Sequence, residues 1–156
     1  MVGPLRIPMI AFLRRLYRDT AGAPAVEFAL LMPVLITLAL GALKFGLALN
    51  NYVMLTNGTD AAARILAISR GNSTPYTTAT NQLYSSASTL TRASMTVTVT
   101  VNGSACSGDS SCQTALNSAQ GKAASVQVSY PCDLQVYKYN FAPSCSLSAQ
   151  STELVQ

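Results

Sequence analysis

The amino-acid sequence predicts an α+β protein, because helical patterns come first and strand patterns follow. Residues 25–43 form an apolar run whose only charge is Glu27, and apolar side chains continue at helical spacing to about residue 90. From Met95 onward the period changes to two. Helices followed by strands are typical of a domain with an antiparallel sheet. We therefore predict a long N-terminal helix that continues into a small domain, with a second helix and a sheet of three or four strands.

The apolar run is long enough to cross a membrane. Its 19 residues correspond to a helix of roughly 28 Å, close to the thickness of the hydrocarbon core of a bilayer. Residues 1–22 carry four arginines and one aspartate, which favours a cytoplasmic N-terminus and an exported C-terminal part. The remaining residues hold six basic and five acidic side chains, so the sequence does not indicate a nucleic-acid partner.

Glu27 is the unusual residue of this run. One interpretation is a carboxylate that is tolerated near the cytoplasmic face, where water still reaches it. The other is that the carboxylate meets a positive charge, because a cut after Gly22 would give Ala23 a new α-ammonium and make Glu27 the fifth residue. Pro33 removes one backbone hydrogen bond from the helix, which predicts a kink or local loosening near residues 29–33.

The residues around Glu27 carry a resemblance to a known family. Gly22, followed by Glu27, Phe28 and a long apolar helix, resembles the processing site of type IV prepilins. The wider pattern is similar to the TadE-like family, the small pseudopilins of the tight-adherence (Flp) pilus system, over about residues 19–70. It comprises residues 22–31, Pro33, Leu40-Gly41, Phe45-Gly46 and residues 61–64. Lys44 departs from it, because the family often has an acid before Phe-Gly.

The resemblance implies a pathway and a set of partners. A prepilin peptidase would cut between Gly22 and Ala23 and remove residues 1–22, a basic cytoplasmic leader. Residues 23–49 would be the transmembrane and assembly helix in the bacterial inner membrane, and residues 50–156 a periplasmic, pilin-like α+β domain. The protein would act as a minor pseudopilin in assembly, initiation or capping of the pilus. Its partners would be the peptidase, other pilins and pseudopilins, the inner-membrane assembly platform and membrane lipid.

Other interpretations of the N-terminal part and of the function stay open. One alternative to an unfolded leader is that residues 5–17 form a short amphipathic helix on the membrane surface. An ordinary secretory signal would be cut after about Gly41 and would release a soluble protein. The function that competes most directly with a pseudopilin is a membrane-anchored envelope binding module, or an adhesin, that is not incorporated in a pilus.

The helical pattern beyond the apolar run predicts two helical segments in the domain. The first continues to Arg70 with Gly71 as its C-cap, and Gly58 softens it so that Thr59 or Asp60 caps a restart. We expect this helix to pack on the domain through Ala61, Ile65 and Ile68. The second helix begins with Thr74 as N-cap and Pro75 as first residue and ends at about Leu90, with apolar positions Leu83, Tyr84, Ala87 and Leu90.

The strand pattern is strongest where valines alternate with threonines. Met95, Val97, Val99 and Val101 alternate with polar residues and are followed by Asn102-Gly103, a turn signal. Further strands are predicted at residues 124–130 and 133–141, with a weaker fourth at residues 147–154. Such a small sheet needs a helix on one face to be stable.

The four cysteines all follow the apolar run, which predicts disulfides in an oxidising compartment. Three pairings are possible, and short loops favour Cys106 with Cys112 and Cys132 with Cys145. A zinc site is not indicated, because there is no histidine and no C-x-x-C. The missing histidine also removes the usual general base, and the exported acids are scattered. We therefore expect no enzymatic activity, no cofactor and no metal.

Overall fold

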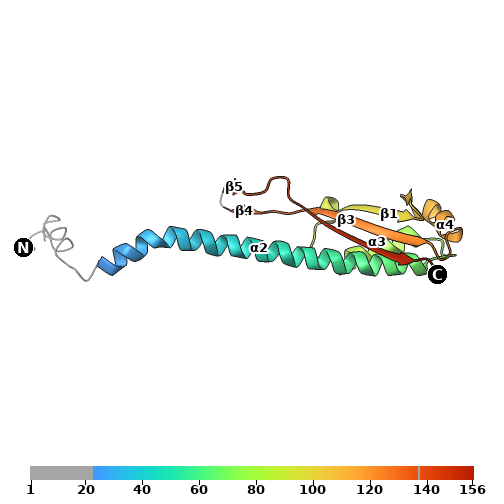
Figure 1. The fold of residues 1–156 in the computed structure, drawn as a ribbon, viewed down its shortest axis with the longest axis horizontal. Helices are drawn as coiled ribbons and strands as arrows, with labels where there is room; N and C mark the ends of the chain where they lie inside the picture. Colours follow the sequence, from blue (N-terminus) through green and yellow to red (C-terminus); the bar gives the residue numbers. More distant parts are fainter. Residues whose placement is uncertain (1–22, 137) are drawn as a thin grey trace, which may run out of the picture. The chain divides into compact units, whose positions relative to one another are not determined.

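The computed structural model describes residues 23–136 and 138–156. The predicted leader, including Gly22, lies outside the described residues. The described residues divide into two units, of which the first ends at Gly41 and the second comprises residues 42–156. One helix, α2 (Ala23–Ile68), belongs to both units (Figure 1).

The second unit is an α+β domain, as the sequence predicted. Its sheet has four antiparallel strands in the order β2-β1-β3-β6. The C-terminal part of α2 and α3 lie along one face of this sheet (Figure 1). The strands are β1 (Thr96–Val101), β2 (Ser104–Cys106), β3 (Ala123–Pro131) and β6 (Ser146–Leu154), and the further helices are α3 (Pro75–Ser86), η2 (Arg92–Ser94) and α4 (Asp109–Asn117).

The core of the domain lies between the helices and the sheet. On β1 and β3 the inward valines alternate with partly or fully exposed polar residues, so the period-two prediction is confirmed. On α2 the predicted inner face is right at Ile65, which packs against the core, and at the half-buried Ala61. It is wrong at Ile68, which is 62% exposed, and it omits Leu55 and Leu66, which are fully buried. The physical reason is that α2 has apolar side chains on several sides, so spacing alone does not identify the face that the sheet covers.

Gly58 marks a close approach of α2 to α3. A Cβ atom at this position would lie 3.1 Å from Cδ1 of Leu83 and 3.2 Å from its carbonyl oxygen. The predicted restart at this residue is wrong, since α2 is continuous and the Thr59 hydroxyl donates to the Leu55 carbonyl within it (2.7 Å). The glycine therefore serves helix packing rather than a break.

The N-terminus of α3 is capped from another helix. Thr74 occupies the N-cap position but its side chain makes no capping hydrogen bond. Instead the carboxylate of Asp109, in the first turn of α4, accepts hydrogen bonds from the Thr77 amide (2.8 Å) and the Thr77 hydroxyl (2.6 Å). A carboxylate at this place satisfies a free N–H group and complements the helix dipole.

This cap makes the stability of the domain depend on pH. The Thr77 hydrogen bonds hold the pKa of Asp109 below its ordinary value. Because the pKa of Asp109 is lower in the folded state than in the unfolded state, its carboxylate stabilises the domain fully above the unfolded-state pKa. This stabilisation is lost as the pH falls through the folded-state pKa. We expect the melting temperature of the wild type to fall more between pH 5 and pH 2 than that of Asp109→Asn. Equal pH slopes in thermal unfolding would contradict this assignment.

Two elements end or divide differently from the prediction. Helix α3 ends at Ser86 rather than at Leu90, although Leu90 is still buried. The single strand predicted at residues 133–141 is wrong, because this segment forms a separate two-stranded hairpin of β4 (Gln135–Val136) and β5 (Tyr139–Asn140). Asp133 causes the first bend, since its carboxylate accepts a hydrogen bond from the Gln135 amide (3.1 Å).

Two disulfides close short loops in the domain. Cys106 at the end of β2 pairs with Cys112 in α4, and Cys132 pairs with Cys145 around the hairpin. Their Cα atoms lie 5.1 Å and 5.4 Å apart, as disulfide geometry requires. This is the pairing that the loop lengths favoured.

The Cys106–Cys112 bridge fixes β2 to α4 within the core. Replacing both cysteines by alanine is expected to lower the free energy of unfolding by about 2–4 kcal/mol, because the unfolded chain loses a cross-link. Urea unfolding of the full chain in detergent, followed by the near-ultraviolet signal of its tyrosines, measures this change. A reducing agent should lower the stability of the wild type toward that of the variant. An unchanged midpoint in the double variant would contradict a stabilising bridge.

Candidate functional site

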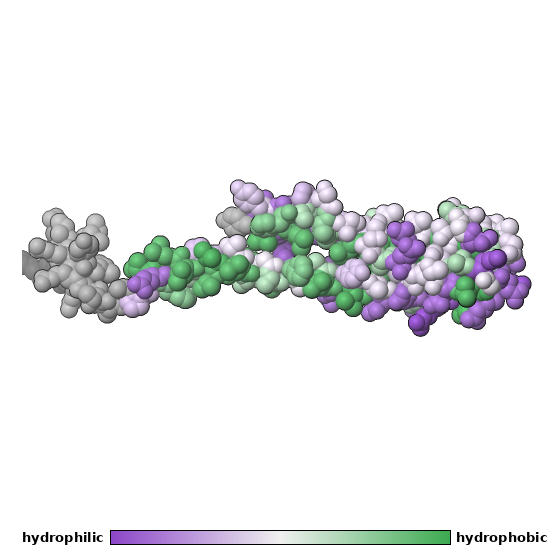
Figure 2. Space-filling model, in the orientation of Figure 1, coloured by the Kyte–Doolittle hydropathy of each residue, from purple (hydrophilic) through white to green (hydrophobic). Residues whose placement is uncertain are grey.

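The main functional feature of the first unit is the exposed apolar surface of α2. From Pro24 to Leu40 every side chain is exposed, and the only charge is Glu27. An ordinary surface helix of a soluble protein has a polar face, whereas the residues of this segment other than Glu27 and Thr37 are all apolar. The face of the segment that Figure 2 shows is accordingly mostly green, the colour of hydrophobic residues. Among the described residues, α2 is the one helix long and apolar enough to cross a membrane.

The predicted processing residues lie at the start of this helix. Ala23 is the first residue of α2, and Glu27 follows one turn later with its side chain exposed. Phe28 is 55% exposed. The structure therefore brings Ala23, Glu27 and Phe28 into the first two turns of one helix, while Gly22 is not described.

Pro33 lies inside α2 without ending it. The ring removes one amide donor from the helix, and the Thr37 hydroxyl donates to the Pro33 carbonyl (2.7 Å). The blue, N-terminal part of α2 bends in Figure 1. A role for this position in assembly stays a prediction.

In the second unit, an ion pair joins α2 to the hairpin. The Lys44 ammonium lies 2.9 Å from a carboxylate oxygen of Asp133. The hydrogen bond from Lys44, together with that from the Gln135 amide, holds the pKa of Asp133 below its ordinary value. Sequence reasoning noted Lys44 only as a departure from the family pattern. No local signal identifies its partner, because Asp133 lies 89 residues further along the chain.

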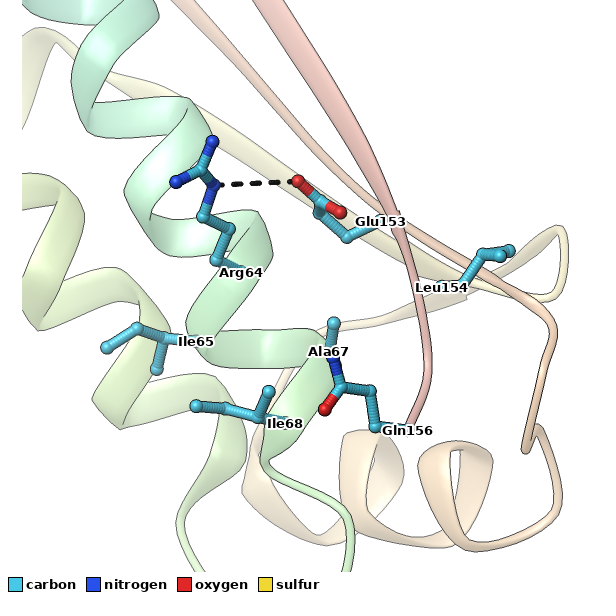
Figure 3. Close-up of a pocket in the computed structure, with 7 residues that line it drawn as sticks. All are labelled: Arg64, Ile65, Ala67, Ile68, Glu153, Leu154 and Gln156. Atoms are coloured by element: carbon cyan, nitrogen blue, oxygen red, sulfur yellow. Dashed lines mark ion pairs between the residues drawn. The ribbon is translucent and has the colours of Figure 1, made fainter.

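A shallow cleft opens at the other end of the domain. Its volume is about 470 Å³, and it lies where the C-terminal end of α2 meets β6 (Figure 3). Arg64 and Glu153 face each other across it, with 3.6 Å between guanidinium and carboxylate atoms. The side chains of Ile68 and Leu154 are more than 60% exposed. The exposed ion pair between Arg64 and Glu153 contributes little to the stability of the domain.

Two aspartates and all four cysteines are engaged within the fold of the described residues. Within residues 23–136 and 138–156, no group of three or more histidine, cysteine, aspartate or glutamate side chains is placed to hold a metal ion. All four cysteines are oxidised in pairs. Asp109 and Asp133 are each occupied by hydrogen bonds that connect elements of the fold.

These features define a class of protein: a disulfide-bonded α+β domain carried on a long, exposed apolar helix. A family model described as TadE-like protein matches residues 22–64, which is most of α2. The similarity to the TadE-like family is therefore carried by this segment of the 156-residue chain, and that family is associated with the Tad pilus system. A search of curated proteins and a search of solved structures each found no match.

Proposed function

We propose that this protein is a minor pseudopilin of the tight-adherence pilus. A prepilin peptidase cuts it after Gly22, and it then acts in assembly, initiation or capping of the pilus. The observation that carries the proposal is the exposed apolar segment of α2 over residues 24–40, whose only acid, Glu27, is the fifth residue when Ala23 is counted as the first. This segment lies within the part of the chain that matches the family.

Lipid or protein must cover the exposed apolar surface of α2 both before and after assembly. Surfaces of this kind are not stable in water and mark a membrane or protein contact. In the first stage lipid covers the helix, with the N-terminus in the cytoplasm and the domain in the periplasm, as the arginines of residues 1–22 favour. In the second stage the helices of other pilins and pseudopilins replace lipid, with the assembly platform moving the subunit out of the membrane.

In this mechanism Glu27 sets the axial position of an incoming subunit relative to its neighbour. Cleavage creates an ammonium at Ala23, and the carboxylate of Glu27 on a neighbouring subunit pairs with it. Away from water such an attraction is stronger than on a surface, although desolvation removes much of the gain. The pair therefore selects one axial position of the incoming helix rather than supplying most of the binding energy. The chain itself needs no catalytic group or cofactor for this role.

Deletion of the gene in its own host tests the proposed function. We expect the deletion strain to lose pili, counted by electron microscopy, and to regain them with the wild-type gene on a plasmid. The matched control is a plasmid that encodes Gly22→Leu, which we expect to accumulate uncleaved protein without restoring pili. Normal piliation in the deletion strain, together with lost binding of one surface or partner, would support the adhesin alternative instead.

A further inference from the structure

The segment closed by the second disulfide carries strongly exposed aromatic side chains. We call residues 132–145 the hairpin loop; it contains β4 and β5 and is closed by the Cys132–Cys145 bridge. Tyr139 is 75% exposed and Phe141 is 71% exposed, the two most exposed aromatic side chains of the described residues. Lys138 between the strands is also exposed. Exposed apolar side chains that are grouped in one segment indicate a surface for contact with a membrane or a protein.

The hairpin loop is held beside a defined point of α2. Lys44 is the first charged residue after Glu27 along the helix, so it marks the end of the uncharged apolar segment. Its ammonium pairs with Asp133 at the start of the loop (2.9 Å), and Asp133 also accepts from the Gln135 amide. A cleft of about 150 Å³ between these elements is lined by Lys44, Leu47, Ala48 and by Tyr130, Pro131, Cys132. The loop therefore begins at the level of the helix where the uncharged segment stops.

We propose that the hairpin loop rests on the lipid headgroup region of the membrane from which α2 emerges, with Tyr139 and Phe141 as its anchors. The inference rests on the proposed membrane-spanning role of α2. Tyrosine is enriched at this depth of a bilayer, because its ring is apolar and its hydroxyl stays in contact with water. Phenylalanine contributes apolar surface that enters the boundary between headgroups and acyl chains. Lys138 adds attraction to anionic headgroups.

Such a contact would position the domain before assembly. A single helix permits rotation and tilt of the domain above the bilayer, whereas a second point of contact restricts both. Docking two aromatic rings buries their apolar surface reversibly and does not insert the loop across the membrane. The loop can therefore leave the lipid when the subunit moves into the pilus.

Tryptophan fluorescence tests this proposal in the full chain, because the protein contains no tryptophan. Phe141→Trp places a reporter in the hairpin loop, and Leu154→Trp is the matched control on an equally exposed site of β6 (63%). Val34→Trp reports on the apolar helix. Each variant is reconstituted in phosphatidylethanolamine and phosphatidylglycerol vesicles whose acyl chains carry bromine, a contact quencher, either near the headgroup or near the chain end.

The expected result separates the loop from the helix. Tryptophan at residue 141 should lose roughly half of its emission with shallow bromine and much less with deep bromine, because interfacial side chains enter only about 5–10 Å. Tryptophan at residue 154 should be quenched by neither lipid. Tryptophan at residue 34 should be quenched by deep bromine.

Two outcomes overturn the inference in different ways. If residue 34 is quenched and residue 141 is not, α2 spans the membrane but the hairpin loop does not touch lipid; a blue-shifted, unquenched emission then assigns the loop to a protein contact. If residue 34 is not quenched either, the proposed membrane-spanning role itself fails. Equal quenching of residues 141 and 154 would also contradict a specific contact of the loop.

Discussion

Glu27→Ala is expected to be cleaved normally and to be almost absent from pili. The physical reason is that an assembled helix bundle excludes water, so the ammonium of Ala23 would be buried without its partner. Breaking one side of a buried ion pair costs about 3–5 kcal/mol, which corresponds to roughly a hundredfold or greater loss of incorporation. The amount of the protein in sheared pili, divided by the amount of mature protein in the membrane, measures this effect.

Two variants separate charge from shape at this position. Glu27→Gln keeps the size of the side chain and removes its charge, so we expect it to fail nearly as severely as alanine. Glu27→Asp keeps the charge on a shorter side chain and should restore part of the incorporation. Wild-type incorporation of Glu27→Gln would show that Glu27 is only a tolerated interfacial carboxylate.

Leu83→Ala is expected to cause a large loss of stability in the α+β domain. Leu83 is fully buried, and its side chain packs against Gly58 where α3 crosses α2. Truncating a buried leucine typically costs about 2–5 kcal/mol, because a cavity remains in a core that relaxes only in part. Domains of this size are stable by about 5–15 kcal/mol, so a single substitution removes a large share.

Urea unfolding of the full chain in detergent measures this loss. Leu154→Ala is the matched control, since Leu154 is 63% exposed at the end of β6 and its truncation should change the unfolding free energy by less than about 0.5 kcal/mol. Similar midpoints for the two variants would contradict the helix packing described for Gly58 and Leu83.

The features that the sequence predicted well are those with a strong local pattern. Alternating valines and threonines identify β1, and Gly71, which has a positive φ of 78°, lies just beyond the end of α2 at Ile68. The cysteine pairs follow from short loops. The apolar character of α2 follows from composition alone.

The features that were missed depend on contacts between distant residues. Strand β2 and helix α4 are short and polar, and their position follows from pairing with β1 and from the Cys106–Cys112 bridge. Sequence spacing does not predict that Asp109 caps a helix 32 residues earlier. Nor does it identify the partner of Lys44, which lies 89 residues further along the chain.

The most direct test of the proposed function is the N-terminal residue and intact mass of the protein isolated from its own cells without reducing agent. We predict a mature chain that starts at Ala23, with both cysteine pairs oxidised, and the full-length form in a strain that lacks the prepilin peptidase. A mature chain that starts at Met1 would leave a membrane-anchored module. A start near Ala42 would make the apolar segment a discarded signal. Either of these two results would contradict processing as a pseudopilin.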